Sequence, residues 1–313
     1  MTKPLKFFLV TVVMVGIILS VIELLSRVIL HRIYNRNFDS SLIVDNKYFA
    51  SPGLKENAAG LVWGKPFNTD EFGGRRTANY NSKKKKWLFL GDSVTEGVGV
   101  DDSSTFASLC SKEFPEFNVL NCSLIGYSTS DYYNVLRSVL QNDTAVELVS
   151  LFYCLNDVYG NSAKDLPVMS KQNFVGTANA FLQNRCAAYK LVKLFFYHNS
   201  DNYFKYDSQF YAEDNPRFKE SMNYIKQSDS LCRSKNIFFQ VVMLPYKSQL
   251  KDYGKANRPQ QLVKQFCNAH SISFSDAALP LSRQTKVNAL YLFADEIHFS
   301  DKGHRAIAEY LSE

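Results

Sequence analysis

The chain has 313 residues, of which 46% are hydrophobic and 21% charged, and its formal net charge is +6. This composition excludes intrinsic disorder for the bulk of the chain. Residues 1–36 contain five basic side chains and one acidic side chain, so only +2 is left for the rest of the sequence. We therefore expect no basic surface of the kind that binds nucleic acid.

The first predicted element is a membrane-spanning helix. Residues 7–22, FFLVTVVMVGIILSVI, carry no charge, and apolar residues resume after Glu23. A helix needs about 20 residues to cross the hydrocarbon core of a bilayer. A cleaved signal would have a shorter apolar run and a small-residue cleavage site, and neither is found here. We predict that residues 1–30 are an uncleaved membrane anchor, whose orientation stays open because basic residues flank it on both sides.

Residues 31–80 are rich in glycine and proline and have few periodic apolar positions, which predicts a linker or extension packed on the following domain. Beyond residue 80, short apolar runs alternate with stretches of helical periodicity. The runs that predict strands are 87–90, 119–125, 148–153, 237–244 and 272–274, and the stretches that predict helices are 104–114, 130–141, 215–235, 259–270 and 300–312. Such alternation is typical of a parallel sheet between two helical layers. We expect residues 81–313 to form one α/β/α sandwich.

Residues 158–214 interrupt this alternation. They contain a predicted helix near 178–197 and a segment at 195–211 that is dense in Tyr and Phe. We expect an insertion that lies over one edge of the sheet. The six cysteines are too far apart for a zinc site, so we expect no metal and no cofactor. Their positions are 110, 122, 154, 186, 232 and 267.

The first predicted strand runs directly into GDSVTEGVG, residues 91–99. Taken alone, an Asp-Ser pair at a strand-to-helix turn is an ordinary helix cap. However, the carboxyl ends of parallel strands are where α/β sheets bind ligands. The glycines on both sides also let the backbone turn sharply and approach a ligand closely. Ser93 is therefore a candidate nucleophile.

A serine hydroxyl needs a base, and the base needs a third group that holds its tautomer. His298 follows an apolar run at 290–293 and lies three residues after Asp295, so both side chains can face the same side of a turn. The residues His31, His198 and His270 have no Asp three positions before them, and His304, although it follows Asp301 by three, lies in the predicted last helix and not at the junction of an apolar run and a loop. We expect His304 to be a structural residue of the last helix.

Acyl transfer also needs donors aimed at a developing oxyanion. Gly126 follows the second predicted strand, and Asn156 with Asp157 follows the third. Each of these could be an ordinary turn residue. The candidates nevertheless occur at successive strand ends in chain order, with Asp295 and His298 in an Asp-x-x-His pattern after the last strand. This repeated placement favours a common site over four unrelated coincidences.

The set resembles the SGNH, or GDSL-type, superfamily of esterases and acyltransferases, whose blocks carry Ser, Gly, Asn and Asp-x-x-His in that order. The resemblance covers residues 68–312 and implies a flavodoxin-like α/β/α fold. It also implies roles for the candidates. Ser93 is the nucleophile, the backbone amide of Ser93 forms the oxyanion hole with Gly126 and Asn156, and Asp295 and His298 complete the triad.

The segments TDEFGGRR and HFSDKGHRAIAEYL resemble the membrane-anchored bacterial branch of this superfamily. That branch implies a single-pass membrane protein with a periplasmic or other extracytoplasmic catalytic domain. The third block is commonly Gly-x-Asn-Asp, and Cys154 replaces its glycine here. This departure leaves the substrate more open than the triad.

The resemblance implies a membrane-anchored serine esterase that acts on a small-molecule, lipid or acylated-glycan ester, with water as the acceptor. Two alternatives stay open, namely transfer of an acetyl or other acyl group to a cell-surface glycan and a catalytically silent binding domain. The sequence has no G-x-S-x-G elbow, Walker loop or H-E-x-x-H motif. The natural substrate and the oligomeric state are also left open.

Overall fold

The computed structural model describes residues 2–33, 36–78, 84–142, 145–158, 182, 184–196, 199–284, 286–293 and 295–313. The chain divides into two compact units, which are considered one at a time. Unit 1 consists of Met1–Arg36 with Leu166–His198, and unit 2 of Asn37–Asp165 with Asn199–Glu313.

Unit 1 contains two described helices, α1 (Lys3–Ile33) and α6 (Ala187–Phe196). The 31 residues of α1 are long and apolar enough to cross a membrane, a property that signal sequences share. The Glu23 carboxylate accepts hydrogen bonds from the backbone N–H groups of Ala187 and Ala188, at 2.9 and 3.0 Å, and so caps the start of α6. The helix predicted near 178–197 is described only in part, since residues 178–181, 183 and 197 lie outside the described ranges.

Unit 2 is built on a five-stranded sheet in which all strands are parallel. In spatial order the strands are β6 (Phe117–Asn121), β5 (Lys85–Leu90), β7 (Val146–Tyr153), β8 (Phe238–Met243) and β9 (Ser273–Asp276). Along the chain, β5 is followed by β6 on one side of it, and the chain then crosses back to form β7 on the other side. This is the flavodoxin-like strand order, which places a crevice at the carboxyl ends of β5 and β7.

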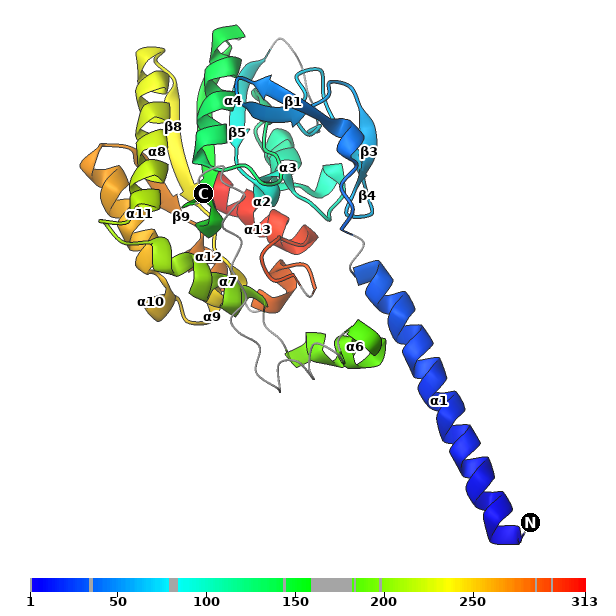
Figure 1. Ribbon diagram of the computed structural model, residues 1–313. Coiled ribbons are helices and arrows are strands. Elements are labelled where there is room, and N and C mark those ends of the chain that lie inside the picture. Colours follow the sequence, from blue (N-terminus) through cyan, green and yellow to red (C-terminus); the bar gives the residue numbers. More distant parts are fainter. Residues whose placement is uncertain are drawn as a thin grey trace. The chain divides into compact units, whose positions relative to one another are not determined.

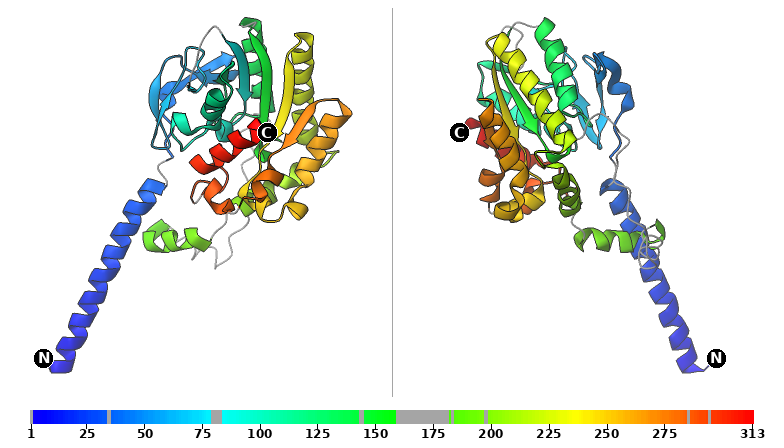
Figure 2. Two further views of the ribbon diagram at one scale, coloured as in Figure 1. Left: turned by 180° about the vertical axis from the view of Figure 1, so that it is seen from behind. Right: turned by 60° about the vertical axis from the view of Figure 1, so that its left-hand side comes forward.

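Helices cover both faces of the sheet (Figures 1 and 2). One layer contains α3 (Phe106–Glu113) and α13 (Asp301–Ser312), which contact each other. The opposite layer contains α4 (Thr129–Asn142), α8 (Pro216–Ser234) and α11 (Arg258–Ala269). The predicted three-layer α/β/α sandwich with a central parallel sheet is therefore confirmed.

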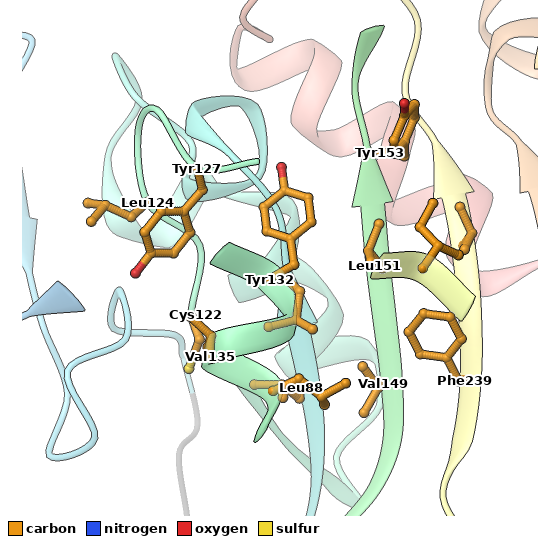
Figure 3. Packing of buried hydrophobic residues seen from close by; sticks show 14 of the residues in the cluster. Leu88, Cys122, Leu124, Tyr127, Tyr132, Val135, Val149, Leu151, Tyr153 and Phe239 are labelled. Atoms are coloured by element: carbon orange, nitrogen blue, oxygen red, sulfur yellow. The ribbon is translucent and has the colours of Figure 1, made fainter. Parts of the chain in front are cut away.

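The side chains of β5 alternate between two separate cores. Leu88 and Leu90 belong to the cluster shown in part in Figure 3, which the sheet forms with α4 and α8. Trp87 and Phe89 point the other way and pack with Phe106 of α3. Because both faces are covered, the strand has no polar face, and this is why it appears in the sequence as a continuous apolar run. Each fully buried apolar side chain of this size stabilises the fold by about 1.5–3 kcal/mol.

The second strand is shorter than predicted. The apolar run extends to residue 125, but β6 ends at Asn121. Beyond it the chain follows the end of β5, because the backbone N–H groups of Cys122 and Leu124 donate to carbonyl oxygens of Phe89 and Gly91. Cys122 and Leu124 are apolar because they are buried in the same cluster as Leu88 (Figure 3).

Residues 37–78 form two antiparallel hairpins in unit 2. The first pairs β1 (Ile43–Tyr48) with β2 (Ser51–Leu54), and the second pairs β3 (Ala59–Val62) with β4 (Lys65–Asn68). The shorter elements are η1 (Ser40–Leu42), α2 (Ser93–Glu96), η2 (Asp102–Ser104), η3 (Leu155–Val158), α7 (Asn199–Asp207), η4 (Ser208–Phe210), α9 (Lys247–Lys251), α10 (Tyr253–Ala256), α12 (Ala278–Ser282) and η5 (Val287–Leu290). The described part of the predicted insertion is divided between the units, with α6 in unit 1 and α7 in unit 2.

Candidate active site

Ser93 is the first residue of α2, immediately after β5. The Asp92 side chain caps this helix, since its Oδ1 atom accepts a hydrogen bond from the backbone N–H of Val94 at 2.9 Å. Gly97 ends α2 in the left-handed conformation, with φ of 84°. The serine is thus held at the carboxyl end of a central strand, and 8% of its surface is exposed.

A chain of hydrogen bonds connects Ser93 to His298, 205 positions later, and through it to Asp295. Ser93 Oγ lies 2.7 Å from His298 Nε2, and His298 Nδ1 lies 2.8 Å from Asp295 Oδ1. The same carboxylate oxygen accepts backbone N–H groups of Ile297 and His298, at 3.0 and 2.7 Å. Since Nδ1 donates to the carboxylate, Nε2 of the neutral imidazole is left to accept the serine proton.

Asn156 lies in η3, directly after β7, and contacts the residue before the serine. Its Nδ2 atom donates to Asp92 Oδ2 at 3.0 Å, and its Oδ1 atom accepts from the Tyr246 hydroxyl at 3.2 Å. An amide nitrogen carries two N–H groups, so this contact uses only one of them. Asn156 is also partly exposed, whereas the residues on either side of it are buried.

Gly126 lies in the loop between β6 and α4, with φ of 84°. The space that a Cβ atom would occupy there is open, with no heavy atom within 4 Å. The preceding residue, Ile125, donates its backbone N–H to Glu96 Oε2 at 2.9 Å. This bond ties the Gly126 loop to the last residue of the helix that Ser93 begins.

Glu96 is fully buried, and burial raises its carboxyl pKa to about 8. Its Oε1 atom has no hydrogen-bond partner among the described residues. The carboxyl group is therefore largely protonated at neutral pH. The nearby Arg75 guanidinium lowers this pKa, but its effect is smaller than that of burial.

The sequence of the chain also matches a known protein family. The GDSL-like Lipase/Acylhydrolase family matches residues 89–306, more than two thirds of the chain. The chain belongs to this family. It is accordingly an ester-hydrolysing enzyme. No curated protein sequence matches the chain significantly.

Several solved structures of GDSL-type proteins resemble the chain at low identity. A member of the lipolytic G-D-S-L family from Veillonella parvula is 15% identical, with 72% of this chain and 94% of that chain covered and a TM-score of 0.43. A lipase/acylhydrolase from Enterococcus faecalis is 16% identical, with 73% and 93% covered and a TM-score of 0.43. The acetylxylan esterase Axe2 from Geobacillus stearothermophilus is 16% identical, with 72% and 92% covered and a TM-score of 0.42.

Cys154 stands where GDSL enzymes commonly have glycine in the third block. Its side chain is 1% exposed and packs in the core beside α3, within hydrogen-bonding reach of Asp92. Its backbone N–H donates to Asp157 Oδ2 at 2.8 Å, and burial raises the pKa of the Asp157 carboxyl far above its ordinary value. The thiol is thus buried under the site.

Arg75 lies outside the matched family region, and spacing alone gave no reason to select it. The guanidinium is 1% exposed and donates to Asp102 Oδ1 at 2.8 Å. It also donates to the carbonyl oxygens of Glu96 and Val100, at 2.9 and 2.7 Å, and to that of Gly97. Arg75 therefore holds the loop that follows α2.

Trp63 is a second residue that sequence reasoning missed. It lies at the tip of the β3–β4 hairpin, and its ring meets the His298 imidazole edge to face, with centroids 4.8 Å apart and an interplanar angle of 72°. In the sequence, Trp63 could be noticed only as an aromatic residue next to Gly64 in the 31–80 extension.

Among the described residues, His298 is the histidine that hydrogen-bonds to Ser93, and the other histidines do not take part in this contact. His304 in α13 is fully buried, its Nδ1 accepts the Phe106 backbone N–H at 3.2 Å, and burial lowers its pKa to about 3. His270 lies at the end of α11, with Nδ1 2.9 Å from the Phe266 carbonyl oxygen. His31 belongs to α1, and His198 lies outside the described residues.

Proposed function

We propose that the protein is a membrane-anchored serine esterase that works through an acyl-enzyme, with Ser93, His298 and Asp295 as its catalytic triad. The observation that carries this proposal is the continuous hydrogen-bonded chain from Ser93 Oγ through both imidazole nitrogens to Asp295 Oδ1, with 2.7 and 2.8 Å contacts. Nucleophile, base and orienting group are each within the reach that acyl transfer requires.

In the first half-reaction, Ser93 Oγ attacks the carbonyl carbon of the ester, and its proton passes to His298 Nε2. The carbonyl electron pair moves onto the oxygen. When this intermediate collapses, the bond to the alcohol oxygen breaks, and His298 Nε2 gives the proton to the departing alcohol. The acyl group stays on Ser93 Oγ, and Asp295 stabilises the imidazolium throughout.

The oxyanion is stabilised by three donors in this proposal: the backbone N–H groups of Ser93 and Gly126 and the second N–H of Asn156 Nδ2. The contact with Asp92 supports the role of Asn156. Its Nδ2 atom lies 3.0 Å from Asp92 Oδ2, and Asp92 directly precedes the nucleophile in the chain. Open space where a Cβ of Gly126 would lie supports the other donor, because a substrate can approach the backbone closely there. Such preorganised donors supply much of the rate enhancement of acyl transfer.

In the second half-reaction, water attacks the acyl carbon and gives a proton to His298 Nε2. The bond between the acyl carbon and Ser93 Oγ then breaks, His298 returns the proton to Ser93 Oγ, and the acid is released. An acyltransferase would differ only in binding a hydroxyl of an acceptor glycan in place of water. Incubating the enzyme with an activated acetyl ester and candidate oligosaccharides distinguishes hydrolysis from acyl transfer. Free acetate as the main product supports hydrolysis, and acetylated sugar in excess at millimolar acceptor contradicts it.

We further propose that α1 is an uncleaved anchor and that unit 2 functions outside the cytoplasm. The length and apolar character of α1 support a membrane-spanning segment. The long apolar run without a small-residue cleavage site supports its retention as an anchor. The resemblance to the membrane-anchored bacterial branch supports the second. A C-terminal alkaline phosphatase fusion is expected to be active, whereas a silent phosphatase with an active cytoplasmic reporter contradicts the placement.

Hydrolysis of p-nitrophenyl acetate by the full chain in detergent tests the triad. Ser93→Ala is expected to abolish it, and His298→Ala to lower it on the order of 10³-fold or more, because the triad acts as a unit. Ser234→Ala, at an exposed serine outside the site, is the matched control and is expected to retain full activity. Loss of activity in His270→Ala with retention in His298→Ala contradicts the assignment.

A further inference from the structure

The turn that carries Trp63 has an unusual composition for its geometry. Val62 pairs with Lys65 across the β3–β4 hairpin, so Trp63 and Gly64 form a two-residue turn. Both adopt positive φ, at 53° and 72°. Such turns favour Asn-Gly, because the first position must also be left-handed, a conformation that bulky side chains disfavour. Backbone strain of this kind clusters at functional sites.

The strained turn places the indole beside the reacting residues. Trp63 is partly exposed and meets His298 edge to face at 4.8 Å. A Cβ atom at Gly99 would lie 2.6 Å from Leu292 Cδ1 and 3.5 Å from Trp63 Cε3. The absence of a side chain at Gly99, where φ is 81°, therefore lets the Trp63 and Leu292 side chains approach the loop after α2.

The position of the indole indicates which part of an ester it would meet. In the mechanism above, His298 Nε2 gives its proton to the alcohol oxygen, so the alcohol part must lie beside the imidazole. The carbonyl oxygen instead faces the donors at Gly126 and Asn156. A side chain packed on His298 is therefore on the alcohol side of the scissile bond.

The surroundings of Trp63 favour an alcohol that carries hydroxyl groups. Lys65 and Asp101 form an ion pair at 3.1 Å, with side chains 40% and 47% exposed. Lys65 is two residues after Trp63, and Asp101 is two residues after Gly99. An ammonium group has three donors and a carboxylate about four acceptor sites, so both retain hydrogen-bonding capacity beyond their mutual contact. An aromatic face flanked by such groups matches a sugar ring, which has an apolar C–H face and polar edges.

We propose that Trp63 is a specificity-determining residue that packs against the alcohol part of the ester, and that this part is a sugar ring. The inference rests on the proposed triad, because the alcohol side is defined by His298. It assigns a substrate-binding role to a hairpin that precedes the family match at residue 89.

Two acetyl esters with different alcohols test the proposal in the full-length enzyme in detergent. The probes are a mono-O-acetyl methyl glucoside and hexyl acetate, which keep the acyl group constant. Trp63→Ala is expected to raise KM for the sugar ester about tenfold with little change in kcat, since an aromatic contact of this kind is worth about one order of magnitude in binding. KM and kcat for hexyl acetate are expected to stay within about twofold of wild type.

Two further variants separate binding from folding. Trp63→Phe keeps an aromatic face and is expected to restore most of the affinity for the sugar ester. Leu61→Ala alters a side chain on the same hairpin that is 57% exposed, and it is expected to leave KM and kcat unchanged for both esters.

Three results would overturn the inference. An equal fall in kcat for both esters would mean that Trp63 only positions His298. A selective loss on hexyl acetate would indicate an apolar alcohol. A changed preference among acyl chains of one alcohol would place Trp63 on the acyl side. If wild type hydrolyses neither probe nor p-nitrophenyl acetate, the proposed esterase function fails, and the inference with it.

Discussion

At the residue scale, the site depends on polar side chains that keep hydrogen-bonding capacity beyond their structural contacts. Asn156 is the clearest case, because its amide bridges Asp92 and Tyr246 while staying partly exposed. A turn residue with only a structural role would contribute to stability alone. An oxyanion donor would contribute to rate, because its hydrogen bond strengthens as charge develops on the substrate oxygen.

We predict that Asn156→Ala lowers kcat about 10²- to 10³-fold while the folded state persists. Steady-state kinetics and the thermal melting temperature of the same preparation measure both. A melting temperature that collapses together with activity would instead identify Asn156 as a structural turn residue.

We predict that the buried Glu96 carboxyl group makes the stability of the fold depend on pH. Burial raises its folded-state pKa from 4.5 to about 8, so between these values the folded state holds a proton that the unfolded state has released. The free energy of unfolding therefore falls as pH rises through this window and levels off above about pH 8. Glu96→Gln is expected to remove this slope and to be more stable than wild type at pH 9.

Urea unfolding from pH 5 to 9 measures this effect. Glu113→Gln changes an exposed carboxyl group in the neighbouring helix α3 and is the matched control, expected to keep the wild-type slope. A Glu96→Gln protein with an unchanged slope would show that Glu96 is ionised in the folded state.

At the element scale, the 37–78 hairpins stabilise the loop after α2. The link is Arg75, whose guanidinium contacts Asp102 and three backbone carbonyl oxygens of residues 96–100. A planar guanidinium can satisfy these acceptors in several directions at once, whereas an ammonium group cannot. The extension thus acts on the segment that carries Ser93.

We predict that Arg75→Lys destabilises the fold by about 3–5 kcal/mol, because it breaks a buried charged network and leaves carbonyl oxygens unsatisfied. Urea unfolding measures the loss, and kcat for p-nitrophenyl acetate is expected to fall with it. Arg76→Lys, at an exposed neighbour, is expected to change stability by less than about 0.5 kcal/mol. Equal effects of the two substitutions would contradict this account of Arg75.

At the scale of the whole molecule, the sheet and its helices could be predicted because burial on two faces leaves a local pattern. The strand predicted at 148–153 and the helix predicted at 300–312 end at the same residues as β7 and α13, and their starts differ by two residues and one residue. The end of β6 could not be predicted, since Cys122 and Leu124 lie in a loop and are nevertheless buried in the same core cluster as Leu88. An apolar run does not distinguish the two kinds of burial.

The hairpins, and the roles of Trp63 and Arg75, left no comparable local pattern in the sequence. Trp63 and Arg75 act through contacts with His298 and the loop at 96–100, which the fold alone brings near. By contrast, Ser93, Asp295 and His298 could be selected from the sequence, because their chemistry restricts the residue types and strand ends restrict their positions. The structure places these three side chains in one hydrogen-bonded chain.

The central claim is that Ser93 is a nucleophile activated by His298, and the most direct measurement is covalent labelling. Full-length protein treated with a fluorophosphonate is digested, and the modified residue is located by mass spectrometry. We predict a single phosphonylated site at Ser93, absent in Ser93→Ala and greatly slowed in His298→Ala. Labelling at another serine, or unchanged labelling of Ser93 in His298→Ala, would contradict the account.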